Sequence, residues 1–306
     1  MLFDELARTS AAVAGTSARS AKTRLIAECL GSAGPDEVAI VVAYLAGELR
    51  QRRTGLGYAA LREFPVPAAE PTLTVTEVDA AFAEMSTLAG AGSAGRRREL
   101  FGALAARATA GEQRLLAGLI GGELRQGAMD GVMLDAIALA AALPASDVRR
   151  AVMLCGATGP VAEAALSVGA PGLAAFVLQV GRPVRPMLAQ PGADVADALA
   201  KTGPAAAEWK LDGIRVQIHR DGGEVAVFTR TLDDITARVP ELVTAALALP
   251  VRSVVLDGEA IALRADGRPL PFQATAARSA RRDGATAVAL TPVLFDCLHL
   301  DGADLL

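Results

Sequence analysis

The sequence predicts a multidomain α + α/β protein, in which an all-helical N-terminal domain is followed by a partial, antiparallel-sheet-rich domain. Three observations predict this fold class. From Leu2 to about Gly181, apolar residues recur every three or four positions, as on one face of a helix. Four prolines fall within 181–204, and beyond them polar and apolar residues alternate, which is typical of strands. We therefore expect domains at 1–180 and 205–306, with a connector at 181–204.

Capping signals mark helix boundaries in the first domain. Thr109 and Glu112 have the spacing of a capping box, in which each side chain binds the other residue's backbone amide. The pattern predicts a helix that buries Leu115, Leu116 and Leu119. Pro35 predicts the start of another helix through Val38–Leu45, because its missing amide costs nothing in a first turn. Further helical segments are expected within 78–88, 100–106, 132–143 and 148–154.

The second domain begins with a hairpin signal. Residues 215–220 alternate polar and apolar side chains, Asp221-Gly222-Gly223 favours a tight turn, and 224–229 returns. A second strand is expected at 253–263, before a turn at 265–268. Residues 272–282 have helical periodicity, and 293–300 have the composition of a buried strand.

Charge and cysteine usage exclude several classes of protein. The formal charge is −4, so a uniformly basic nucleic-acid-binding surface is excluded and any phosphate-binding surface must be a local patch. Cys29, Cys155 and Cys297 are too far apart for a metal knuckle or a disulfide framework. The N-terminus lacks a secretory pattern, and the uncharged stretch 164–181 is interrupted by glycine and proline. We expect a reduced, cytoplasmic monomer with no membrane partner.

The residues that carry chemistry centre on the sequence Glu208-Trp209-Lys210-Leu211-Asp212-Gly213-Ile214-Arg215. Only three of the 30 cationic residues are lysines, so Lys210 beside Asp212 and Gly213 stands out. A lysine attacks only as the neutral amine, and lowering its pKa from about 10.4 to ~7 takes roughly 4–5 kcal/mol. Burial or nearby cations would supply that energy. Asp212 opposes such a shift, so orientation and hydrogen bonding are its expected tasks, while Gly213 permits close backbone approach.

This Lys-x-Asp-Gly-x-Arg stretch resembles the nucleotidyltransferase motif shared by ATP-dependent DNA ligases, RNA ligases and capping enzymes. The resemblance implies that Lys210 attacks the α-phosphate of ATP and forms a phosphoramidate with AMP. Three later segments resemble further motifs of the family in the same order: Phe228-Thr229-Arg230-Thr231, Leu256-Asp257-Gly258-Glu259 and Leu294-Phe295-Asp296-Cys297-Leu298. A short motif alone has a real false-positive rate, and the ordered set makes coincidence improbable.

The resemblance also implies roles for the residues that bind ATP or AMP. Glu208 would accept a hydrogen bond from the adenine amino group, and Arg215 would hold the sugar or α-phosphate. Phe295 would stack on adenine, since a wide apolar ring suits a flat base. Arg230 would face the nucleotide or DNA phosphates.

Glu259 would contact the ribose or a catalytic metal, expected to be Mg²⁺, which carboxylates and water suit. Asp212, Gly213 and Asp257 would support these groups. Two plainer interpretations remain open: Phe295 as a core aromatic, and Asp257 as a residue that only shapes the turn before Gly258.

The long helical half separates the members of this superfamily, because capping enzymes place their lysine much nearer the start of the fold. The half resembles the helical DNA-binding domain of larger DNA ligases, most clearly at 122–129. Arg125 and the amides after Gly127 would meet a backbone phosphate at a helix start. The resemblance therefore implies an ATP-dependent DNA ligase that seals nicks in double-stranded DNA.

The resemblance fails after Phe295. The family's later Glu-Gly and Lys-x-Lys segments and its OB-fold do not occur in the sequence. We expect a C-terminally truncated ligase, whose 205–306 segment is the N-terminal part of an adenylation domain and which cannot seal nicks alone. The alternatives are a non-catalytic DNA-binding module and an RNA ligase.

Overall fold

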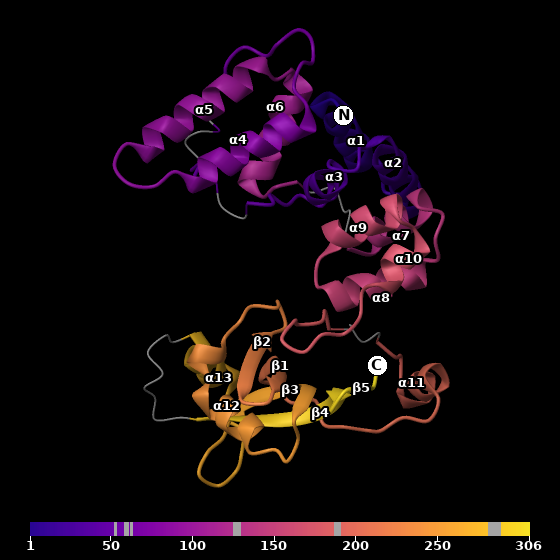
Figure 1. The fold of residues 1–306 in the computed structure, drawn as a ribbon, viewed down its shortest axis with the longest axis vertical. Helices are drawn as coiled ribbons and strands as arrows, with labels where there is room; N and C mark the ends of the chain where they lie inside the picture. The colour runs from indigo at the N-terminus through magenta and orange to yellow at the C-terminus, as the bar shows by residue number, and fades with distance from the viewer. Residues whose placement is uncertain (52–53, 58–60, 62–63, 125–129, 187–190, 281–288) are drawn as a thin grey trace. The chain divides into compact units, whose positions relative to one another are not determined.

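The computed structural model forms two compact units. It describes residues 1–51, 54–57, 61, 64–124, 130–186, 191–280 and 289–306. The helical unit comprises Met1–Val152 and Ala157–Phe176, and the sheet unit comprises Met153–Gly156 and Val177–Leu306 (Figure 1). An all-helical region followed by an antiparallel sheet confirms the predicted fold class.

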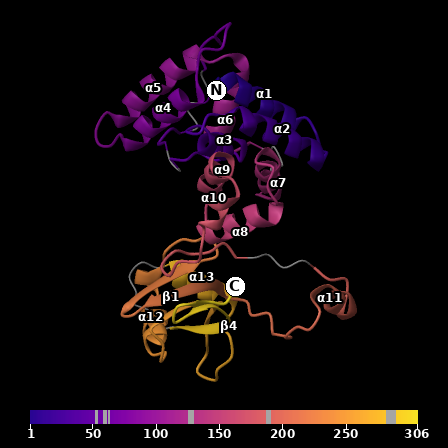
Figure 2. The ribbon, with the colours of Figure 1, turned by 45° about the vertical axis from the view of Figure 1, so that its right-hand side comes forward.

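Ten α-helices fall between residues 3 and 174 in the described part of the chain (Figure 2). They are α1 (Phe3–Ala14), α2 (Arg19–Ser32), α3 (Val38–Leu45), α4 (Val75–Thr87), α5 (Ser93–Arg107), α6 (Ala110–Gly121), α7 (Asp130–Ala140), α8 (Ala145–Cys155), α9 (Thr158–Ser167) and α10 (Ala170–Ala174). None of the helices that the structure describes combines the length and hydropathy needed to cross a bilayer.

The predicted capping box is present at the start of α6. The Thr109 side chain accepts from the Glu112 amide, and the Glu112 side chain accepts from the Thr109 amide. Leu115, Leu116 and Leu119 are buried, as the periodicity predicts. The helix predicted through Val38–Leu45 is present as α3, but it does not start at Pro35, because a turn occupies 35–37 and the helix begins at Val38.

The core of the helical unit is built around Tyr44. Its ring meets those of Phe3 and Phe82 edge-on, at centroid distances of 6.3 and 6.4 Å. All three rings are fully buried, and edge-to-face pairs add to the stabilisation that burial itself provides. Tyr44 therefore anchors α3 between α1 and α4.

The sheet unit contains a five-stranded antiparallel sheet in the order β2-β1-β3-β4-β5. The strands are β1 (Ile214–Asp221), β2 (Glu224–Thr229), β3 (Ser253–Ala262), β4 (Leu290–Leu300) and β5 (Ala303–Asp304). The other elements are α11 (Val195–Thr202), the 3-10 turn η2 (Thr236–Arg238), α12 (Pro240–Leu247) and α13 (Phe272–Ala280).

The predicted hairpin is correct in register. Asp221 pairs with Glu224 across a two-residue turn, and Gly222 has a φ of 58°. A positive φ favours glycine, which explains the glycine at position 222. On one face of the hairpin, Val216 and Ile218 join the core that α12 covers with Leu242.

Strand β4 is less buried than its composition predicts. Leu294 and Phe295 expose 40% and 42% of their surface, so the expectation of a buried strand at 293–300 is wrong. Beyond β4 the structure places only the short β5, which pairs with His299 and Leu300. Two register shifts against β3 further change which side chains face the core.

The first residues after the helical half lie against β1. The side-chain amide of Gln217 pairs with the backbone of Val184: its Oε1 accepts from the Val184 amide at 3.0 Å and its Nε2 donates to the Val184 carbonyl. The Gly181 amide donates to Nδ1 of His219 at 3.1 Å. Residues 181–184 thus cover the face of β1 opposite the α12 core; we call them the strap.

Candidate functional site

Lys210 lies in the irregular segment that precedes β1. Its side chain is 85% exposed and forms an ion pair with Asp212, which is 74% exposed. The hydrogen bond and negative charge of Asp212 raise the pKa of the Lys210 amine. The expectation that the surroundings destabilise the ammonium is therefore wrong for this conformation, because the lysine is solvated and paired.

Arg215 and Asp257 form a bidentate ion pair across β1 and β3. Nε of Arg215 donates to Oδ1 at 3.1 Å, and Nη2 donates to Oδ2 at 2.7 Å. The Asp257 side chain is 7% exposed and that of Arg215 is 29% exposed. Asp257 lies inside β3 rather than at a turn, so the turn-shaping interpretation is wrong. Its contact with Arg215 raises the pKa of the guanidinium and fixes the guanidinium plane.

Phe295 stands next to this ion pair. The guanidinium carbon of Arg215 lies 5.7 Å from the centroid of the Phe295 ring, within cation–π range. The ring is exposed rather than buried in the α12 core. An exposed aromatic with a cation at its face differs from the core residue that composition alone would favour.

Glu259 contacts the lysine motif directly. Its Oε1 accepts from the Gly213 amide at 3.0 Å. Burial raises the pKa of the Glu259 carboxyl, against the lowering effects of the Gly213 amide and the Arg215 charge. A Cβ on Gly213 would lie 2.5 Å from the Ala260 carbonyl oxygen. Gly213 is needed here because the motif runs against the backbone of β3.

The remaining predicted site residues make fewer contacts with Arg215, Asp257 and Glu259. Glu208 is exposed in the segment before Lys210. Arg230 is exposed at the end of β2 and lines a small hollow with Arg215, Gln217, Thr229 and Pro186. Arg125 and Gly127 lie outside the described residues.

Two residues of the sheet were missed by sequence reasoning about the site. Gln217 and His219 bind the strap, and both are buried. Burial lowers the pKa of His219 to about 4, and the Phe228 ring meets the imidazole edge-on at 5.1 Å. The sequence shows only that polar residues alternate with apolar ones on β1. That alternation fits a buried polar face and a solvated face equally well.

The order of elements places the chain in a known architecture. The solved structure named "Pmar-Lig_Pre." matches 95% of this chain and 56% of its own chain, with a TM-score of 0.52 at 15% sequence identity. The likeness shows a shared fold: a helical region followed by an antiparallel sheet.

Sequence comparison is more specific. Residues 186–306 match the family model "ATP dependent DNA ligase domain", and residues 60–138 match "DNA ligase N terminus". A probable DNA ligase of Beutenbergia cavernae is 58% identical over 316 residues, covering 100% of this chain and 62% of the relative. A probable DNA ligase of Streptomyces griseus is 56% identical, covering 100% of this chain and 61% of the relative. The chain is thus similar to DNA ligases along its whole length, and to the ATP-dependent DNA ligase domain over 186–306, as its motifs predict; it spans about three fifths of the length of these relatives.

Proposed function

We propose that this chain carries the lysine of an ATP-dependent DNA ligase, and that Lys210 takes AMP from ATP so that the whole protein can seal nicks in double-stranded DNA. One observation carries the proposal. The Gly213 amide of the lysine motif is bound by Glu259, and next to it Asp257 holds Arg215 over Phe295. A nucleophile, a carboxylate, a cation and an aromatic ring thus gather on one side of the sheet.

The proposed first step is a phosphoryl transfer. The neutral amine of Lys210 attacks the α-phosphorus of ATP; the N–P bond forms, the bond to pyrophosphate breaks, and the amine loses its remaining extra proton to solvent. AMP then passes to a DNA 5′-phosphate, and a neighbouring 3′-hydroxyl displaces it. Positioning and electrostatics carry most of the catalysis in such reactions.

Each neighbouring residue has a task in this proposal. Arg215, oriented by Asp257, would bind the sugar or α-phosphate, and Phe295 would stack on adenine. Glu208 would accept from the adenine amino group, and Arg230 would bind a phosphate. The ion pair with Asp212 must open before attack, because a hydrogen-bonded ammonium has no lone pair.

Mg²⁺ fits the carboxylate chemistry of this site. Among the described residues, no group of three or more potential ligands surrounds one point. Mg²⁺ nevertheless often binds through one or two carboxylates, water and substrate phosphates. Glu259 is a half-buried carboxylate beside the motif and would be the protein's ligand. When bound, the ion offsets charge on the departing pyrophosphate.

Labelled ATP tests the proposal. The 306-residue chain is incubated with ATP labelled in its α-phosphate and with Mg²⁺, and the adduct is located by peptide mass spectrometry. We expect an AMP adduct on Lys210 that Lys210→Ala and Lys210→Arg abolish and that Lys201→Ala retains. AMP on a residue other than Lys210 would overturn the assignment. We expect no multiple-turnover nick sealing by the chain alone.

A non-catalytic DNA-binding module is the second candidate, favoured by the exposed, paired state of Lys210. It predicts duplex binding without any Lys210-dependent adduct. An RNA ligase would instead prefer RNA ends to nicked duplex DNA. We further propose that the protein is a monomer and that it is cytoplasmic; its three free cysteines support the reducing compartment.

A further inference from the structure

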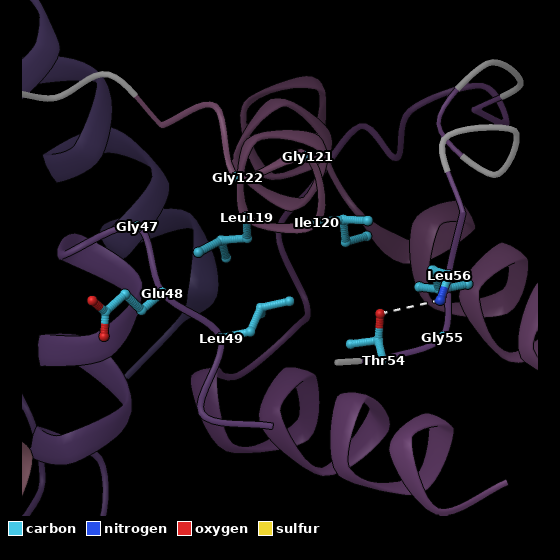
Figure 3. Close-up of a pocket in the computed structure, with 10 residues that line it drawn as sticks. All are labelled: Gly47, Glu48, Leu49, Thr54, Gly55, Leu56, Leu119, Ile120, Gly121 and Gly122. Carbon is cyan, nitrogen blue, oxygen red and sulfur yellow. Dashed lines mark hydrogen bonds between the residues drawn. The ribbon is translucent and has the colours of Figure 1, made fainter. Parts of the chain in front are cut away.

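The helical unit contains a cavity of about 750 Å³ that is separate from Lys210 and its neighbours. Two segments line it: residues 47–49 and 54–56, which follow α3, and residues 119–122, at the end of α6. In Figure 3, Leu49 and Leu119 project between the two segments. The cavity combines exposed loop backbone with a few apolar side chains.

The same pentapeptide occurs in both regions of the sequence. Gly-Glu-Leu-Arg-Gln is found at 47–51 and again at 122–126. Gly47 and Gly122 each follow a helix closely, with φ values of 81° and 65°, and such positive values favour glycine at a helix C-terminus. The same five residues thus follow a helix twice in the sequence: Gly47 comes two positions after α3 ends, and Gly122 comes directly after α6.

The two copies also touch. Leu124, the third residue of the second copy, lies so close to Gly47 that an added Cβ there would be 3.3 Å from the Leu124 Cβ. A Cβ on Gly118 would lie 2.8 Å from the Leu124 side chain. The second copy therefore packs against the glycine that opens the first.

Asp79 on α4 holds the first copy in place. Its Oδ2 accepts from Nη1 of Arg50 at 2.9 Å, and its Oδ1 accepts from Nε2 of Gln51 at 2.9 Å. The Tyr44 hydroxyl donates to the same Oδ1 at 3.2 Å. The Asp79 side chain is 15% exposed and that of Arg50 is 45% exposed. One carboxylate thus connects the buried core to both polar residues that end the pentapeptide.

We infer that Asp79 is a positioning residue, which orients Arg50 beside the cavity to bind a phosphate of the duplex DNA backbone. This inference rests on the proposed function. A guanidinium is a planar fork of donors, so a carboxylate that bonds Nη1 fixes the direction in which the exposed part of the fork points. Arg125 is the equivalent residue of the second copy and lies outside the described residues.

The sign of one affinity change separates positioning from simple electrostatics. Asp79→Asn removes a negative charge near the proposed DNA surface, so electrostatics alone predicts tighter binding. Positioning predicts weaker binding, because Arg50 loses its fixed orientation. Asn can still accept one hydrogen bond, which limits the damage to the loop.

The experiment measures binding of the 306-residue chain to a fluorescent nicked duplex over a salt series. We expect Asp79→Asn to weaken affinity about tenfold and Arg50→Gln to weaken it similarly and to reduce the salt slope by about one. The double variant should bind the duplex no more weakly than either single variant, because both changes remove the same contact between Arg50 and DNA. Additive losses would show that Asp79 acts independently of Arg50 and would overturn the inference.

Glu84→Gln is the matched control: it removes a carboxylate from the same helix, where the side chain lies 3.9 Å from Arg96. Its affinity should equal that of the unmodified chain. If Asp79→Asn fails to fold, Arg50→Gln decides alone, and unchanged affinity and salt slope would overturn the inference. Absence of duplex binding by the unmodified chain would instead overturn the proposed DNA substrate.

Discussion

Replacement of Asp257 by asparagine tests the energetic weight of the Arg215 ion pair. The substitution keeps the shape and one acceptor but removes the charge from a site where the carboxylate is 7% exposed. Breaking a fully buried pair costs about 3–5 kcal/mol. Arg215 is 29% exposed, so water recovers part of this, and we expect a loss of roughly 2–3 kcal/mol.

Calorimetry measures this loss as a change in Tm. For a unit of this size, 1 kcal/mol corresponds to roughly 3–5 °C, so the transition of the sheet unit should fall by roughly 6–15 °C. The control is Asp266→Asn, since Asp266 is 55% exposed and lies 3.9 Å from Arg268. Exposed pairs contribute about 0–1 kcal/mol. Equal shifts for the two variants would refute the reasoning.

Three further predictions concern the same unit. Asp212→Asn should lower the pKa of Lys210, because Asp212 is the main cause that raises it. An amine-reactive reagent should then label Lys210 at lower pH. An unchanged dependence of the labelling rate on pH would count against this cause. Burial lowers the pKa of His219 to about 4, below its unfolded value of about 6.5, so stability present above pH 6.5 is lost as the pH falls toward 4. The free energy of unfolding, measured with denaturant at several pH values, should fall by about 3 kcal/mol less across this range in His219→Gln than in the unmodified chain. Parallel plots of this free energy against pH for the two proteins would contradict the prediction. Gly258→Ala should lower the free energy of unfolding by about 2–4 kcal/mol, because a Cβ would lie 2.6 Å from the Val293 carbonyl oxygen. The control is Gly223→Ala, where a Cβ meets nothing within 4 Å. Equal losses in the two variants would contradict the prediction.

Features set by a few neighbouring residues could be predicted from the sequence. The capping box at Thr109 and Glu112 and the hairpin at Asp221–Glu224 are local, because their hydrogen bonds join residues at most three positions apart. The ordered motifs also predicted the family. Pro35 shows the limit of local signals, since a turn and a helix start both accept proline.

Features that depend on long-range register could not be predicted in the same way. The ion pair of Arg215 and Asp257 joins positions 42 residues apart, and alternation on β1 does not say which residue lies opposite. The exposure of Phe295 depends on the register shifts between β3 and β4. Lys210 lacks the expected burial: the lysine and its ion-pair partner Asp212 are both exposed.

The start of β1 limits how far the nucleophile can travel. The strand begins at Ile214, so the segment bearing Lys210 is fixed to the sheet four residues beyond the lysine. Four residues of extended chain reach at most about 14 Å. The lysine can therefore swing through a short arc about Ile214, leaving the ladder between β1 and β3 intact while its amine exchanges one partner for another.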